Sequence, residues 1–272
     1  MTKISSTDRS HYLEKIKPYE TVIKTLLARE QTTLQDIKQS NDDSGFQKLV
    51  YLADEMIFLA SNCLVVGGVS QSMLNIRSED ALNEARKSIY KAVIYLERVV
   101  SPLVDAPFAE YEERLAKIAA IDVKSRYDMV KKLGLVLDLL KNAYGENTKW
   151  RWAFVEIEGR YAAVAKNALN LKAALANTDP RSPDYEPTVH YLHLVEKLLG
   201  EAADRYRERY ELSTNHINDL KMGIHFLNAL RRIHGIFGER YNAEIIKKKA
   251  EIWTVKLEHD MKKQKEAVLK KL

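Results

Sequence analysis

The sequence brings histidines and carboxylates together around HYLHLVEK (residues 190–197). On a helix, Glu186 and His190 share one face, and His193 and Glu196 share another, because residues three or four apart lie one above the other. Metal sites in helical bundles use this chemistry, with Glu-x-x-His pairs on facing helices. Here the gap between Glu186 and His190 is four, and no second half-site is evident. We therefore expect surface histidines, no metal site and no cofactor.

The other reactive side chains stand alone in the sequence. His216, His225 and His234 are nine residues apart, so they alternate between faces and one helix cannot bring them together. Cys63 is the single cysteine and lies in the apolar context SNCLVV, with no Lys, Arg or His close by. A reactive thiolate needs such a neighbour or a helix N-terminus. We expect a buried structural thiol.

Motifs of the common enzyme classes are absent from the sequence. There is no Walker loop, GxGxxG, HExxH, EF-hand or GxSxG motif. Carboxylates are plentiful, but no pair is singled out by its spacing. We predict that the protein is not an enzyme, with catalysis by residues distant in sequence left as an alternative.

One stretch, residues 145–172, contains two tryptophans on either side of an arginine, Trp150, Arg151 and Trp152. On a helix the two indoles lie about 200° apart, so they cannot share a face. Such a helix is either packed between neighbours, or its Trp and Arg side chains anchor a peptide in a groove. Together with Arg160, these three residues are candidates for partner binding.

The C-terminal segment carries the net charge of +5. Residues 240–272 contain ten Lys or Arg and five Asp or Glu, so the rest of the chain is neutral overall. Steps of three and four residues connect an apolar stripe, which comprises Ile246, Ala250, Trp253, Leu257, Met261, Gln264, Val268 and Leu272. A helix of this length is stable only if its stripe is buried.

Three partners could bury this stripe. The first is the protein's own preceding helix, which we expect up to about residue 257, and the second is another protein chain. The third is a polyanion, either an anionic membrane surface or a nucleic acid. The candidate contact residues are Lys248, Lys256, Lys262 and Lys263.

The elements that position these groups are predicted to be helices. Ten glycines and six prolines in 272 residues are too few for the many turns of a sheet protein. Apolar residues recur at helical spacing, as from Leu82 to Val99, where Ser78 precedes the stripe as a candidate N-cap. We predict an all-α fold of eight or nine helices, arranged as antiparallel hairpins in an α-solenoid or as an irregular bundle.

Breaks in the helical pattern suggest the domain organisation. NTDPRSPDYEP (177–187) holds three of the six prolines and is the best linker candidate. We predict an N-terminal helical array over 1–176 and C-terminal helical hairpins over 188–272, either separate or as one continuous domain. Gly67 and Gly68 are expected to end a helix. Gly159 is expected to allow a bend before one alanine-rich helix over 161–176.

Two fragments resemble tetratricopeptide repeats, which are helical hairpins with a Gly-containing turn. In LRRIHGIFGERYNAEIIKKKAEI (230–252), Gly238 stands at the turn, and Ala243 and Ala250 follow with the family's spacing of seven. GRYAAVAKNALNL (159–171) is similar. The two turns are 79 residues apart, which is not a multiple of the 34-residue period. The resemblance implies a TPR-like packing style and a protein or peptide partner on a concave face, without catalysis.

One segment raises the question of a membrane. Met56 to Ile76 has no charged residue over 21 positions, but polar residues interrupt it, and its strongly apolar part is short for a bilayer. We expect a buried helix and turn, without stable membrane insertion. The N-terminal residues lack the apolar region of a secretory signal, and a single cysteine suits a reducing compartment. We predict a cytoplasmic protein.

Together these observations predict a non-enzymatic helical-repeat protein, a scaffold or adaptor that binds another protein or peptide. The first alternative is binding of RNA or an anionic surface through the Lys-rich C-terminal helix. The second is a metal-dependent helical-bundle enzyme. No feature of the sequence predicts an oligomeric state.

Overall fold

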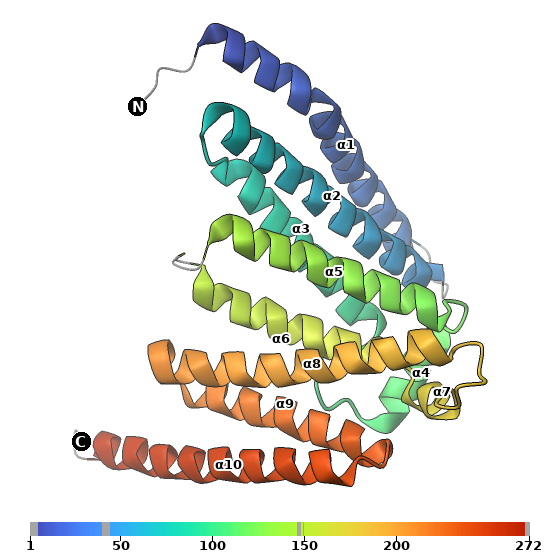
Figure 1. Cartoon of the computed structure of the whole chain (residues 1–272), viewed down its shortest axis with the longest axis vertical. Helices are drawn as coiled ribbons and strands as arrows, with labels where there is room; N and C mark the ends of the chain where they lie inside the picture. Colours follow the sequence, from blue (N-terminus) through green and yellow to red (C-terminus); the bar gives the residue numbers. More distant parts are fainter. Residues whose placement is uncertain (1–4, 40–43, 146–147, 149, 270–272) are drawn as a thin grey trace. The chain divides into compact units, whose positions relative to one another are not determined.

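The computed structural model describes residues 5–39, 44–145, 148 and 150–269, and the regular structure in these ranges is helical throughout (Figure 1). The ten α-helices are α1 (Ser6–Gln39), α2 (Ser44–Leu74), α3 (Glu79–Val99), α4 (Phe108–Lys117), α5 (Val123–Tyr144), α6 (Arg151–Ala168), α7 (Leu171–Ala176), α8 (Tyr185–Arg209), α9 (Ile217–Ile236) and α10 (Arg240–Leu269). A π-helical turn, η1 (Tyr210–Thr214), follows α8. The predicted all-α fold is confirmed.

Two short helices, α4 and α7, raise the number above the predicted eight or nine. The single helix expected over 161–176 was wrong, because the backbone of Leu169 is extended, with φ −77° and ψ 118°. Asn170 then caps α7, since its side-chain oxygen accepts a hydrogen bond of 3.0 Å from the Ala173 N–H. The hydroxyl of Tyr111 donates to the Leu169 carbonyl. The break is therefore held by a distant side chain.

The helix expected to end at Gly67 and Gly68 continues to Leu74. Gly67 faces α3, where an added Cβ would lie 3.8 Å from the side chain of Leu82. Packing against α3 offsets the low helix propensity of the two glycines. The helix ends instead at Asn75, which adopts a left-handed φ of 51°.

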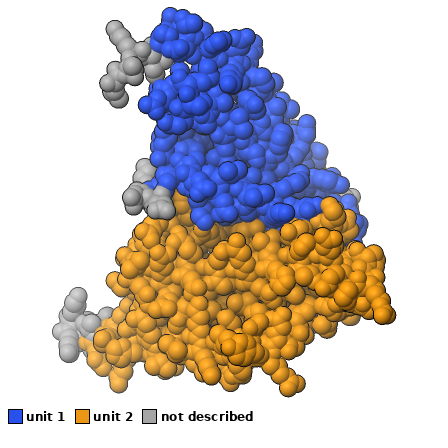
Figure 2. Space-filling model, in the orientation of Figure 1, with its two compact units in different colours: residues 1–100, 113–121, 128–148 blue, residues 101–112, 122–127, 149–272 orange. Residues whose placement is uncertain are grey.

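The chain divides into two compact units (Figure 2). Unit 1 comprises residues 1–100, 113–121 and 128–148, and unit 2 comprises residues 101–112, 122–127 and 149–272. The predicted linker at 177–187 falls inside unit 2, between α7 and α8 and into the first turn of α8. The division into domains 1–176 and 188–272 stays a prediction.

In unit 1, α1, α2 and α3 pack against one another in chain order as antiparallel neighbours (Figure 1). Ser78 caps α3 as predicted, with its hydroxyl 3.4 Å from the Ala81 N–H. The negative charges of Glu79 and Asp80 in the first turn interact favourably with the helix dipole. The predicted stripe is buried, and it consists of Leu82, Ala85, Ile89, Ala92, Leu96 and Val99.

In unit 2, the long helices α6, α8, α9 and α10 also pack in chain order (Figure 1). Gly159 lies where α6 crosses α8, and a Cβ there would lie 2.6 Å from Cε2 of Tyr206. The Tyr206 ring is buried and stacks on Phe226, with ring centroids 5.7 Å apart, so it has no space to withdraw. Gly159 therefore permits a close helix approach within α6, which continues through this residue.

A loop between α3 and α4 is attached to α6 by two adjacent polar side chains. The amide of Asn167 donates to the carbonyls of Ser101 and Leu103, at 2.8 and 2.9 Å. The ammonium of Lys166 donates to the Val104 carbonyl at 2.6 Å. Burial lowers the pKa of Lys166 to about 8, because the charged form loses its hydration.

The contact at Gly159 gives a stability prediction. Gly159→Ala should lower the free energy of unfolding by about 1–3 kcal/mol, because the new methyl group overlaps the Tyr206 ring. Gly235→Ala is the matched control in α9, since nothing lies within 4 Å of its added Cβ, and it should be neutral or stabilising by up to about 1 kcal/mol. Urea unfolding measures both. Equal effects of the two substitutions would contradict the close approach.

Lys166 gives a prediction for pH. Above pH 8 the folded state releases the Lys166 proton, whereas the unfolded chain keeps it up to the ordinary lysine pKa of 10.5. The unfolded state then binds more protons, so stability contributed by this site rises between these two pH values. Lys166→Met should remove the rise, and Lys172→Met, at an exposed lysine of α7, should keep it. If the free energies of unfolding of wild type and Lys166→Met changed equally with pH across this range, the prediction would be contradicted.

Candidate partner-binding surface

One face of α10 packs against the other helices of unit 2. Ala250 and Trp253 are buried there. Trp253 packs beside Gly223 of α9, where an added Cβ would lie 3.1 Å from Cζ3 of the indole. The same Cβ would lie 3.1 Å from the carbonyl oxygen of Ala203 in α8. Both distances are shorter than most Cβ contacts in proteins, so the glycine at residue 223 allows three helices to meet at close range.

The contacts between α10 and its own unit extend beyond residue 257, the predicted limit. Tyr210 donates a hydrogen bond of 2.6 Å to a carboxylate oxygen of Asp260, and the side-chain amide of Gln264 lies 3.4 Å from the carbonyl of Asn215. Residues 268 and 272 of the predicted stripe lie where side chains are not described. Up to Gln264, α10 therefore docks on its own unit.

The opposite face of α10 carries a second apolar stripe, which the sequence analysis missed. Its members are Tyr241, Ile245, Ile252 and Val255, which are 80%, 46%, 68% and 67% exposed. Lys248 occupies the place between Ile245 and Ile252, so the positions follow alternating steps of four and three. This is the heptad spacing of a helix that pairs with another helix. The spacing is present in the sequence, where Lys248 interrupts the apolar residues.

Charged rows flank the outer stripe, each with a spacing of seven residues. The acidic row contains Glu244, Glu251 and Glu258, and the basic row contains Lys249, Lys256 and Lys263. Lys249 pairs with Asp204 at 2.7 Å, and Lys256 pairs with Asp260 at 3.3 Å. The candidate lysines 248, 256, 262 and 263 are all exposed on this helix, so the outer stripe and the four lysines belong to one surface.

The candidate residues of α6 lie elsewhere in unit 2 and contact their own chain. Trp150 directly precedes α6, and the guanidinium of Arg151 lies 4.7 Å from the ring centroid of Trp152. Arg151 also forms an ion pair of 2.6 Å with Glu208 of α8. Arg160 pairs with Glu156, its neighbour one turn earlier, at 3.9 Å. The ion pair between Arg151 and Glu208 connects α6 to α8, and a partner-binding role for Trp150, Arg151, Trp152 and Arg160 stays a prediction.

Cys63 is buried within α2, as expected. Burial raises the pKa of its thiol to about 12, and the negative charge of Glu84 contributes in the same direction. The thiol therefore stays protonated near neutral pH and is a poor nucleophile.

One helix in the described part of the chain is long and apolar enough to cross a membrane. It is the segment Gly45–Leu74 of α2, and 56% of its most apolar 18-residue window is buried within the protein. Its buried residues pack against α1 and α3, as in a core helix of a folded unit. The absence of stable membrane insertion stays a prediction.

The model of the TP0443 family matches residues 8–261, and no curated protein matches the chain. A structure described as "DHF58 filament" is 12% identical and has a TM-score of 0.36, with 95% of this chain and 99% of that chain covered. A second, described as "Computational Design of Self-Assembling Cyclic Protein Homooligomers", is 13% identical with a TM-score of 0.31, with 94% and 96% covered. These similarities are too low to support an argument about function, and the tetratricopeptide resemblance stays a prediction.

Proposed function

Because the chain belongs to the TP0443 family, whose name states no activity, we propose its function from the geometry of α10. We infer that the protein is a non-enzymatic scaffold or adaptor that binds a helix of another protein chain. The observation that carries this proposal is the outer stripe of Tyr241, Ile245, Ile252 and Val255, exposed on a helix whose other face is already buried.

The outer stripe favours a helical protein partner because its residues have the spacing of a helix–helix seam. Full burial of one large apolar side chain is worth about 1.5–3 kcal/mol. Four such side chains in one line give a partner helix enough apolar contact to offset part of the entropy lost on association. A lone exposed apolar residue would need no such explanation.

The charged rows restrict the orientation of a partner helix. In a parallel pair, each residue of one flank faces the opposite flank of the partner five residues further along, and in an antiparallel pair like flanks face each other. A second copy of α10, paired in parallel, would place Glu244, Glu251 and Glu258 beside Lys249, Lys256 and Lys263. The antiparallel pairing would place like charges together. A partner of α10 is therefore either a second copy in parallel orientation or a helix with matching charge rows.

Polyanion binding is the alternative function for the same helix, and exposed Lys262 and Lys263 favour it. Two observations weigh against it. Lys249 and Lys256 already have carboxylate partners, and the acidic row repels phosphate along one flank.

The double variant Ile252→Glu and Val255→Glu tests the proposal. The protein should associate with itself, measured by sedimentation equilibrium, or with a captured protein, and the variant should weaken this association at least tenfold, because charges enter the apolar seam. Both positions are exposed, so the circular dichroism spectrum should not change. Leu212→Glu, at a residue 66% exposed outside the stripe, is the matched control and should leave association intact.

The dependence of binding on salt distinguishes protein association from polyanion binding. Association through the apolar stripe should persist at high salt, whereas polyanion binding should fall steeply with salt and depend on Lys262 and Lys263. Association that is unchanged in the double variant would contradict the proposal, and so would an absence of any protein partner together with salt-sensitive RNA binding.

A further inference from the structure

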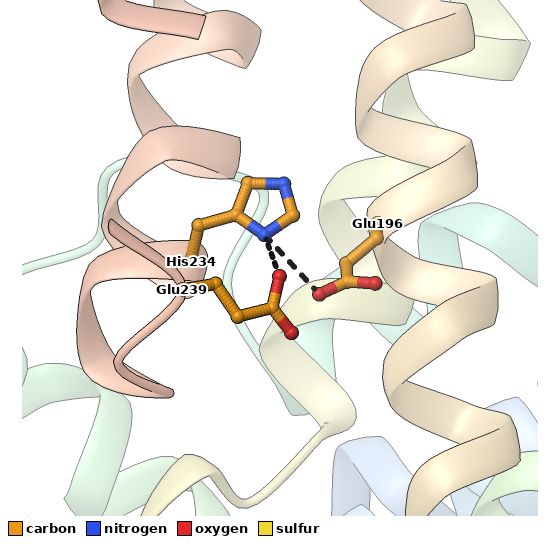
Figure 3. Close-up of side chains that lie close together, drawn as sticks. All are labelled: Glu196, His234 and Glu239. Atoms are coloured by element: carbon orange, nitrogen blue, oxygen red, sulfur yellow. Dashed lines mark hydrogen bonds and ion pairs between the residues drawn. The ribbon is translucent and has the colours of Figure 1, made fainter. Parts of the chain in front are cut away.

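Three side chains that can bind a metal ion meet at one end of the α9–α10 hairpin in unit 2 (Figure 3). Glu196 comes from α8, His234 comes from the last turns of α9, and Glu239 lies just after the glycine turn at residue 238. Their ligand atoms all lie within 4.8 Å of one another. Packing of the hairpin against α8 thus brings His234 and Glu239 close to Glu196, which is remote from them in the sequence.

The spacing of these atoms is close to that of a metal site. Nδ1 of His234 lies 2.7 Å from one oxygen of Glu239 and 3.5 Å from Oε1 of Glu196. Around a tetrahedral Zn²⁺ with bonds near 2.0–2.1 Å, neighbouring ligand atoms are about 3.3–3.5 Å apart. One distance already fits, and the other requires the Glu239 carboxylate to move by less than about 1 Å.

Burial makes the carboxylate of Glu196 unusual, whereas the side chain of Glu239 is 37% exposed. His234 is buried, and its side chain is 11% exposed, against 15% for that of Glu196. Oε1 of Glu196 is shielded from solvent and has no hydrogen-bond partner among the described residues. An unsatisfied buried oxygen of a charged group is unfavourable. A bound cation would satisfy this oxygen and compensate both negative charges.

Neighbouring side chains complete the surroundings of the cluster. The amide of Asn242 donates to the Glu239 oxygen that faces His234, at 2.8 Å, as partners of metal ligands commonly do. His193 lies one turn before Glu196 on α8, and its Nδ1 is 3.3 Å from the other oxygen of Glu196. The exposed His193 or a water molecule would supply a fourth ligand.

We propose that Glu196, His234 and Glu239 form a Zn²⁺ site that fixes the α9–α10 turn to α8. One imidazole nitrogen with two carboxylate oxygens is a ligand set that Zn²⁺ accepts. Because the ligands come from α8, α9 and the turn before α10, the bound ion would cross-link these elements and stabilise the hairpin. This inference does not depend on the proposed partner binding, which concerns the outer face of α10.

The test uses the full chain without an affinity tag that binds metals. After treatment with a chelator, Zn²⁺ is titrated by calorimetry, and Co²⁺ is added to follow the absorption bands of a tetrahedral site. Wild type should bind one ion per chain and unfold at a higher temperature with Zn²⁺ present. Glu239→Gln and Glu196→Gln should each reduce affinity at least tenfold, because each removes a charged ligand and keeps the side-chain volume.

Two substitutions serve as controls. Glu201→Gln removes an exposed carboxylate of α8, and His225→Ala removes an exposed histidine of α9, so both should bind as wild type does. Wild type without saturable binding would overturn the proposal. Binding that is equal in Glu239→Gln, Glu196→Gln and wild type would overturn it as well, since the ion would then sit at other residues.

Discussion

Trp253 fits against α8 and α9 because residue 223 has no side chain, and the position of α10 depends on this contact. An added Cβ at Gly223 would lie 3.1 Å from both the indole and the Ala203 carbonyl oxygen. With Trp253 turned inward, the helical periodicity turns Ile252 and Val255 outward. The contact of Trp253 with α8 and α9 therefore determines which face of α10 is buried and which face is exposed to another chain.

The α9–α10 hairpin carries both proposed sites, at different places. The partner surface runs along the outer face of α10, whereas Glu239 and His234 lie at the turn where the hairpin closes (Figure 3). Gly238 makes that turn possible through its positive φ of 76°. An ion at the turn and a partner along the helix would thus stabilise one element at two separate points.

The sequence predicted what local periodicity and capping determine. The buried stripe of α3, the cap at Ser78 and the burial of Ala250 and Trp253 on the inner face of α10 are confirmed, because each depends on residues within a few turns of one helix. The break at Leu169 and the role of Gly159 were not predicted, because Tyr111 and Tyr206 act on them from other helices. The Glu196, His234 and Glu239 cluster was missed for the same reason, since its members meet only when α8 and the hairpin pack.

The most direct test of the central claim measures which face of α10 is open in solution. Single cysteines at Ile252, Val255 and Ala250 can be labelled with a maleimide, since the native Cys63 is buried and gives little background. In the isolated protein, at concentrations too low for association through the outer stripe, labelling should be rapid at residues 252 and 255. It should be at least tenfold slower at residue 250, which is 6% exposed. Equal rates at the three positions, or protection at 252 and 255 with rapid labelling at 250, would contradict the central claim.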